Sequence, residues 1–319
     1  MKSFQLLVTV CLFATSCLFG QVFTTGDTTP VITNTSSYIY ESGTVLGDKI
    51  IIGNTGIGTL NVNAGGTMYL PPWSSYLSVG EMAGSYGTIT VAGGTLTADD
   101  LEVGKGGSGV LFIGVSGTLN VRYFGTGNNG GTAVLTVSGG AINGTGTLRL
   151  GDDHNSSASF TVTNGGSVSV MNLYVGEGTG RAVLTVSNPS SVTVGMNLEV
   201  GSSGTLAFAL SGTFTSSPVI SVGSTVQVSS GNTYVIDLEN YAATSDMTIV
   251  LMTYATLSGD SNNVHWEFKN YEDTRYSIEN PIWGANELTV KINSIPESSA
   301  SAAILGALAL IFTARRKGK

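Results

Sequence analysis

Residues 132–151 read TAVLTVSGGAINGTGTLRLG, and this stretch decides the fold. Apolar and polar residues alternate over 133–137, which is the period of a β-strand with one buried face. The glycine pair 139–140 then allows a sharp corner, because glycine adopts positive φ at little cost. A second alternation over 148–150 closes on Gly151. The stretch predicts two or three short strands separated by tight corners.

The tetrad that ends this stretch, apolar-x-apolar-Gly, recurs along the chain. Its closing glycines, one of them in a degenerate copy, are about 24 residues apart on average and lie at positions 53, 80, 104, 125, 151, 176, 201 and 223. One such unit cannot bury its apolar side alone, whereas stacked copies share one continuous core. We therefore predict an all-β fold, a parallel β-solenoid (β-helix) of about seven turns. With about 4.8 Å between stacked strands, those turns make a rod about 34 Å long.

Glycine content divides the chain. Residues 43–223 contain 37 of the 44 glycines, whereas residues 231–293 contain three and are rich in tyrosine and tryptophan. We assign residues 46–226 to the solenoid and 227–293 to a β-rich C-terminal cap, because solenoid ends must be covered. A separate small β-sandwich with a binding role is the alternative for the second segment. Residues 21–45 are expected to form an N-terminal cap.

The first 20 residues are typical of a secretory signal peptide. Lys2 precedes an apolar run over residues 6–13 and a small-residue segment, so we expect cleavage near Gly20. A lipoprotein signal with acylated Cys17 is the competing interpretation. The second cysteine, Cys11, also lies in this segment, so the rest of the sequence has no thiol for a disulfide or a thiolate metal site.

The segment 294–319 is predicted to be a sorting tail. It contains an apolar run over residues 302–312, and a basic cluster beyond that run would hold the end in the cytoplasm. The alternative is a buried C-terminal helix. The short motif before the run is Pro296, Glu297 and Ser298, and the basic cluster is Arg315, Arg316 and Lys317.

This tail resembles those of the bacterial PEP-CTERM exported proteins, although Ser298 stands where their motif has a second proline. The resemblance implies export, transient retention in the membrane through the tail, and cleavage by an exosortase-type processing enzyme. Over residues 50–212, the tetrads also resemble the repeats of autotransporters and PEP-CTERM proteins. The tail and the repeat thus indicate the same group independently.

The charge balance argues against a nucleic-acid partner. The chain has 13 basic and 21 acidic residues, and five of the basic residues lie at its two ends. Residues 21–314 therefore carry 8 basic against 21 acidic residues, a net charge of −13. A body of this charge repels nucleic acid and anionic lipid.

Three polar segments are candidates for binding or catalysis. The glycine pattern of 125–130 matches a dinucleotide-binding motif, but a strand pattern follows it, so we interpret it as a turn. Residues 152–155, which include His154, are interpreted as a solvated turn, with weak calcium binding as the alternative. The carboxylates Asp99, Asp100 and Glu102, with Arg122 and Arg149 further along the chain, suggest the acidic site of a polysaccharide lyase. Fold analogy alone does not assign that activity.

We expect a non-enzymatic structural or adhesive protein of the bacterial cell surface, cell envelope or extracellular exopolysaccharide matrix. Its expected partners are exopolysaccharide or surface proteins, and no cofactor or metal is predicted. The alternative is a secreted β-helix that binds or cleaves carbohydrate. Trp73 and Tyr76 could stack on sugar rings, although such rings more often pack over the solenoid edge.

Overall fold

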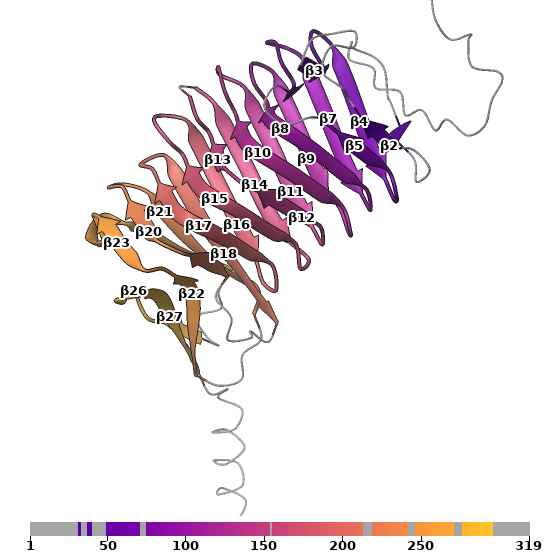
Figure 1. Cartoon of the computed structure of the whole chain (residues 1–319). Helices are drawn as coiled ribbons and strands as arrows, with labels where there is room; N and C mark the ends of the chain where they lie inside the picture. Colours follow the sequence, from indigo (N-terminus) through magenta and orange to yellow (C-terminus); the bar gives the residue numbers. More distant parts are fainter. Residues whose placement is uncertain are drawn as a thin grey trace, which may run out of the picture.

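The chain forms a parallel β-solenoid of about seven turns, which confirms the predicted fold class (Figure 1). The strands lie across a rod and stack along its length. The computed structural model describes residues 31–32, 37–39, 49–70, 75–153, 155–212, 219–241, 246–270 and 276–295. The expected signal peptide, the sorting tail from residue 296 onward with its six motif residues, His154 and Trp73 lie outside the described residues.

One wall of the rod, sheet A, is a ten-stranded parallel sheet: the seven glycine-rich turns contribute one strand each, and three further strands extend the sheet at its two ends. Its strands, in spatial order, are β1 (Val31–Ile32), β4 (Ile57–Asn63), β7 (Tyr86–Ala92), β9 (Ser108–Ile113), β11 (Thr132–Ser138), β14 (Ser157–Thr163), β16 (Arg181–Ser187), β18 (Gly204–Gly212), β21 (Thr233–Tyr241) and β24 (His265–Lys269).

The second wall, sheet B, receives from each turn either one long bent strand or two short ones. Its parallel strands are β2 (Ser37–Ile39), β3 (Lys49–Ile52), β5 (Thr67–Tyr69), β6 (Tyr76–Val79), β8 (Thr95–Val103), β10 (Thr118–Thr126), β12 (Ala141–Gly144), β13 (Thr147–Leu150), β15 (Ser167–Val175), β17 (Ser191–Val200), β19 (Ile220–Val222), β20 (Thr225–Val228), β22 (Met247–Thr253) and β23 (Thr256–Gly259). Six of the apolar-x-apolar-Gly tetrads form the second half of this wall. The tetrad at 220–223 lies instead in the first half, because Ile220 pairs with Val192, and in the degenerate copy the corner glycine is Gly127 and not Gly125, because Phe124 pairs with Leu101.

The core is a set of apolar columns that run along the rod. In sheet A, equivalent leucine, isoleucine and phenylalanine side chains stack in exact register from turn to turn, so that Leu135 pairs with Phe160 and Phe160 with Leu184. All three side chains are almost completely buried. This stacking provides the shared burial that a single repeat lacks.

The tetrad glycines, Gly125 excepted, make corners that only glycine fits. Gly104 has φ +70°, and an added Cβ would lie 2.2 Å from the carbonyl oxygen of Thr132. The next turn therefore passes directly over the corner at van der Waals distance.

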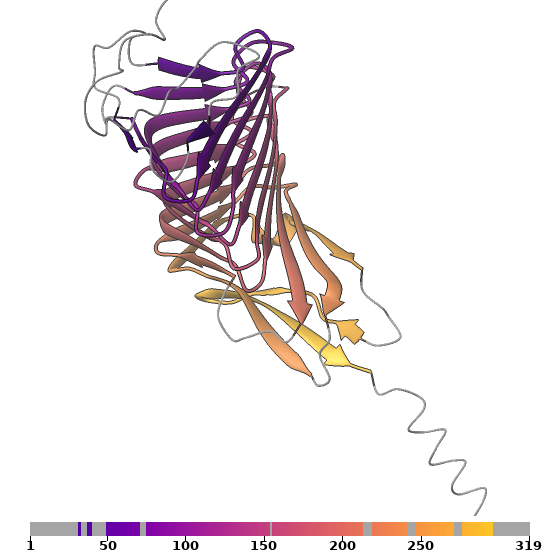
Figure 2. The same cartoon turned by 90° about the vertical axis from the view of Figure 1, so that its right-hand side faces the viewer.

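The parallel stacking continues past residue 226, into the glycine-poor segment. β21 pairs in parallel with β18, and β24 pairs with β21. Three antiparallel pairings then end the stack, because β27 (Glu287–Ser294) pairs with β22, β25 (Tyr276–Ile278) and β26 (Ile282–Trp283). Figure 2 shows these strands at the C-terminal end of the rod.

Helix is nearly absent from the described part of the chain, where the one helical element is a 3₁₀ turn at Ser261–Asn263. Within the same residues, no helix has the length and apolar character needed to cross a bilayer.

An aromatic cluster fills the interior of the last turns. The ring of Tyr234 lies 5.1 Å from Trp266 and 5.6 Å from Trp283, measured between centroids. The Tyr234 hydroxyl is buried without a hydrogen-bond partner, and burial raises its pKa. Aromatic packing here replaces the aliphatic columns of the earlier turns.

We expect Tyr234→Phe to stabilise the protein by about 1 kcal/mol, because it removes a buried hydroxyl that has lost its hydration without gaining a partner. The matched control is Tyr254→Phe, since the Tyr254 hydroxyl donates to the carbonyls of Gly284 and Glu287 at 2.8 and 3.1 Å. That variant should lose about 1 kcal/mol. Denaturant unfolding measures both changes, and equal losses in the two variants would contradict the assignment.

Candidate functional site

Two surfaces of the rod differ sharply in charge. The first, the acidic wall, is the outer side of the second half of sheet B together with its closing corners. Its carboxylates are Glu81, Asp100, Glu102, Asp152, Glu177 and Glu199. The second, the neutral face, consists of the outward side chains of sheet A from β4 to β18.

A buried ion pair lies beside the acidic wall, at the bend of sheet B. Asp99 occupies the point where β8 bends, and its side chain is only 5% exposed. Arg122 on the adjacent strand β10 donates to both carboxylate oxygens, from Nε and Nη2, at 2.6 Å each. Its guanidinium also lies 4.6 Å from the centroid of the Tyr123 ring. The pair locks neighbouring turns together, because a bidentate contact fixes orientation as well as distance.

Glu102 anchors a second cluster. It accepts a hydrogen bond from the Tyr76 hydroxyl, one turn earlier, and forms an ion pair with Lys105 at 3.5 Å. Lys105 also reaches Glu81 at 3.7 Å and lies 5.0 Å from the centroid of the Tyr76 ring. Burial, followed by the hydrogen bond to Glu102, raises the pKa of Tyr76. Tyr76 therefore packs into this cluster and is not presented as a free ring for a sugar.

Arg149 forms the third cluster, in which Nε lies 2.8 Å from Glu177 on the following turn and 3.9 Å from Asp152. Its guanidinium lies 5.3 Å from the centroid of the Tyr174 ring. All three side chains are partly exposed, so solvent screens this cluster and it contributes little to stability.

Three carboxylates of the wall, Asp100, Asp152 and Glu199, have raised pKa values. Burial first, and then the charges of Glu102 and Asp99, raise the pKa of Asp100. Burial also raises the pKa of Asp152 and of Glu199, and the nearby charge of Glu177 adds to both shifts. Burial therefore explains the common direction, and neighbouring carboxylates reinforce it.

These three shifts predict that the acidic wall contributes more stability at mildly acidic pH than at neutral pH. An acid with a raised folded-state pKa contributes stability that is complete below its unfolded value of about 4 and is lost as the pH rises through the folded value. The melting temperature should therefore fall as the pH rises from about 4 toward neutral. Asp100→Asn should flatten this dependence and stabilise the protein at pH 7 by less than about 1 kcal/mol, the scale of half-exposed charges.

Glu239→Gln, at an exposed carboxylate outside the wall, is the matched control and should leave the slope unchanged. A melting temperature that rises from pH 5 to pH 7 would contradict the prediction.

The bend of sheet B also forms a groove of about 360 Å³. Tyr69 exposes its ring at one side, and the Asp99–Arg122 pair lines the other. An amide ladder crosses the groove, because Asn143 donates to Asn120 at 3.1 Å and Asn120 donates to Thr97 at 3.3 Å. An aromatic ring next to hydroxyl and amide groups can bind a small polar ligand with an apolar face.

The neutral face has far fewer charged side chains than the acidic wall. From β4 to β18, the outward side chains of sheet A are Thr, Ser, Asn, Val, Ala, Ile, Tyr and Phe, and Arg181 is the single charged one. Ile57, Tyr86, Phe112, Val134 and Val183 are exposed apolar side chains on this face. Gathered on one flat wall, they form the kind of patch that marks an interaction surface.

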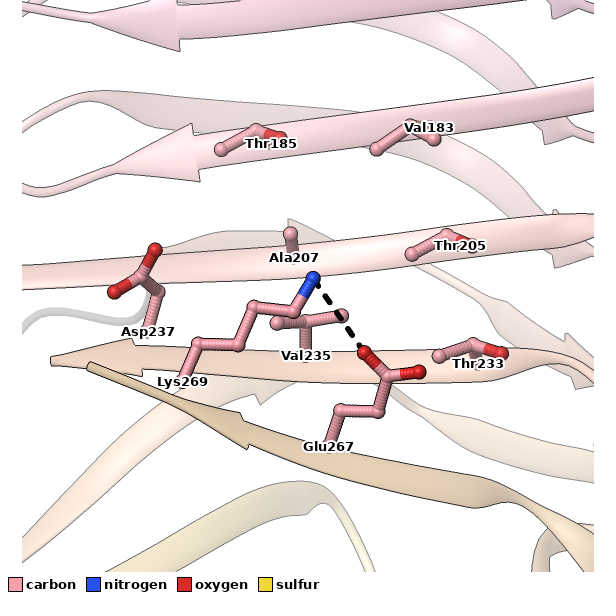
Figure 3. A pocket seen from close by; sticks show the side chains of 9 residues that line it. All are labelled: Val183, Thr185, Thr205, Ala207, Thr233, Val235, Asp237, Glu267 and Lys269. Atoms are coloured by element: carbon pink, nitrogen blue, oxygen red, sulfur yellow. Dashed lines mark ion pairs between the residues drawn. The ribbon is translucent and has the colours of Figure 1, made fainter. Parts of the chain in front are cut away.

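Figure 3 shows where the neutral face ends. A shallow hollow of about 380 Å³ lies over Ala207, whose small side chain leaves room between Thr185 and Val235. At its far side, Lys269 and Glu267 on β24 form an ion pair at 3.4 Å. The hollow is open and brings together no set of acid, base and nucleophile, so it suits contact more than chemistry.

The structure brings together only some of the residues that the sequence indicates. Asp99 meets Arg122 on the adjacent turn, whereas Arg149 joins a different cluster. Residues 125–130 end β10 and turn into β11, which confirms the interpretation as a turn. Asp153 accepts a hydrogen bond from the backbone N–H of Asn129 at 3.3 Å, and the described residues contain no group of three or more potential metal ligands.

Sequence reasoning missed Glu81, Lys105 and Glu177, which complete the ion-pair clusters. Spacing could have indicated the contact between Lys105 and Glu81, because the two residues are 24 positions apart, which is one repeat length. It also missed the neutral face, which is visible only once the outward residues of seven strands are aligned.

Comparison with known proteins adds no assignment. No protein-family model matches the chain, and no curated protein or solved structure shows significant similarity to it.

Proposed function

We propose that this chain is an exported, non-enzymatic structural or adhesive protein of the bacterial cell surface or extracellular matrix. The observation that carries the proposal is the division of the rod into a neutral face, continuous from β4 to β18, and an acidic wall whose carboxylates recur along the rod. Such surfaces suit repeated contacts with a partner along the length of the rod. A single cleft with converging reactive groups, which catalysis requires, would suit an enzyme better.

The sequence signals at the two ends support export and sorting. The tail motif Pro296-Glu297-Ser298 and the cluster 315–317 resemble those of PEP-CTERM proteins, so an exosortase-type enzyme is the proposed processing partner. The membrane is then a transient partner. Exopolysaccharide or other surface proteins are the proposed lasting partners, since the acidic body disfavours nucleic acid.

Mass spectrometry of both ends of the protein, recovered from fractionated bacterial cells, tests this proposal. We expect a new N-terminus near Gly20, a C-terminus between Pro296 and Ser299, and recovery in the envelope or matrix fraction. A control that replaces Arg315, Arg316 and Lys317 with alanine should leave the C-terminus unprocessed. An intact Lys319 in the native chain would contradict sorting, and recovery from the cytosol would contradict export.

The groove at the bend of sheet B favours carbohydrate binding as a second candidate function. Its exposed Tyr69 ring could stack on the apolar face of a sugar while Asn120 and Asn143 contact hydroxyls. The net charge of −13 favours a neutral glycan over an acidic one. Asp99 is already committed to Arg122, which favours binding over cleavage.

We predict that Tyr69→Ala lowers the affinity for a neutral polysaccharide about 5- to 10-fold, the amount that one aromatic stacking contact contributes. Affinity electrophoresis in gels containing the polysaccharide measures the change. Phe112→Ala removes a similarly exposed ring from the neutral face and should have no effect. Equal retention of all three proteins would exclude this groove as the binding site.

A further inference from the structure

The neutral face contains one row of residues with an unusual arrangement. Through the parallel register, Tyr86 on β7 aligns with Ser108, then Thr132, then Ser157, and finally Arg181 on β16. The row therefore begins with a tyrosine and ends with an arginine. β7 and β16 lie equally far from the central strand β11, two strands to either side.

Both ends of this row are available for contact. Tyr86 is 43% exposed. Arg181 is also exposed, and within the described ranges no hydrogen bond or ion pair engages its side chain. An exposed, unpaired cation on an otherwise neutral face of an acidic protein is available for contact with a second molecule.

We propose that the neutral face is a self-association surface on which a second copy of the chain packs face to face. A two-fold axis along β11 makes the rods antiparallel and places Arg181 of each copy over Tyr86 of the other. The guanidinium would meet the ring as a cation–π pair, twice in each dimer. The assignment goes beyond the proposed function and does not depend on how the protein is sorted.

The face is large enough for a stable dimer. Seven strands about 4.8 Å apart, each about seven residues long at about 3.3 Å per residue, cover about 770 Å². Two such faces bury about 1,500 Å² in total, which is within the range of about 1,200–2,000 Å² of specific interfaces. Sheets with small outward side chains can also approach to about 10 Å, the usual spacing of packed sheets.

The charge distribution favours a second copy of the chain as the partner on the neutral face. It also determines which strands of the two copies lie over each other. The acidic walls of two copies repel, so the neutral faces are the surfaces on which close approach costs least. In the antiparallel arrangement, β4 of one copy faces β18 of the other. The charged side chains of β21 and β24, including Asp237, Glu267 and Lys269, then fall outside that overlap.

Substitutions that change the charge at the two ends of the row test the proposal. The full-length protein, as processed by expressing cells, should be a dimer at about 10 µM by size-exclusion chromatography with light scattering, as expected for an interface of standard size. Tyr86→Arg should raise the dimer dissociation constant at least about 100-fold, because it places like charges together at two points. Adding Arg181→Glu to Tyr86→Arg should restore the dimer.

Tyr123→Arg, at an exposed tyrosine on the opposite wall, is the matched control and should leave the dimer intact. Circular dichroism and thermal melts establish that each variant is folded, which is expected because all substituted side chains point outward. A monomeric native protein, a dimer that survives Tyr86→Arg, or a failed rescue would each overturn the proposal. A native monomer that sediments with a crystalline polysaccharide, and that no longer does so after Tyr86→Arg, would assign the face to that polymer.

The test is separate from that of the proposed function. Dimerisation is read from purified protein, whereas export and sorting are read from the fractionation and from the two chain ends. Either result can therefore fail without the other.

Discussion

Gly104→Ala is expected to destabilise the protein by at least about 3 kcal/mol, the range of severe backbone defects. Gly104 has φ +70°, which an L-residue adopts at a cost of about 1–2 kcal/mol. The added Cβ would also lie 2.2 Å from the Thr132 oxygen and 2.5 Å from the Thr132 carbon. Since both atoms belong to the backbone of the next turn, relief requires the stack itself to shift.

Gly130→Ala is the control that separates the two causes. Gly130 has a similar φ, +78°, but an added Cβ would meet nothing within 4 Å. This variant should lose only the conformational cost of about 1–2 kcal/mol. Denaturant unfolding followed by circular dichroism measures both changes. Equal losses of unfolding free energy would mean that positive φ alone explains the need for glycine at the corner, and that close stacking of the turns does not contribute.

Phe160→Ala should cost about 3–5 kcal/mol, the range observed when a buried phenylalanine is truncated. Phe160 is completely buried in the middle of a sheet A column, between Leu135 and Leu184. Parallel ladders hold its neighbours on both sides, so the column can collapse only slightly into the space left behind.

Val134→Ala is the matched control, because Val134 lies on the adjacent strand β11 but points outward and is 43% exposed. Its truncation should change the free energy of unfolding by less than about 0.5 kcal/mol. The same unfolding measurement applies. Comparable losses at the two positions would contradict the assignment of the apolar columns as the main source of stability.

The solenoid could be predicted from the sequence because its corners impose a local chemical requirement. A tetrad that ends in Gly104 or Gly151 marks a place where one turn must pass close to the next, and that requirement recurs at a readable spacing. The end of the stack was less predictable. Beyond residue 226 glycine becomes scarce, yet β21 and β24 continue the parallel ladder, with Tyr234 and Trp266 filling the interior in place of leucine and valine.

The polar clusters depend on register, which spacing gives only approximately. Asp99 and Arg122 are 23 residues apart and lie side by side, whereas Arg149 and Glu177 meet across 28 residues. Insertions at the corners change the number of residues between two paired positions without moving the strands. For this reason composition indicates carboxylates and arginines along the repeat but does not identify which of them pair.

The stacking of turns also has a mechanical consequence. Strands lie across the rod, so the hydrogen bonds between turns are nearly parallel to its long axis. Tension applied between the two ends of the chain should break the hydrogen bonds between one pair of neighbouring turns at a time, so that turns detach successively. Each detached repeat of about 24 residues would release about 80 Å of extended chain. A single rod would then behave as an extensible tether that dissipates force in steps, and pulling one molecule by its ends would record a sawtooth with that period.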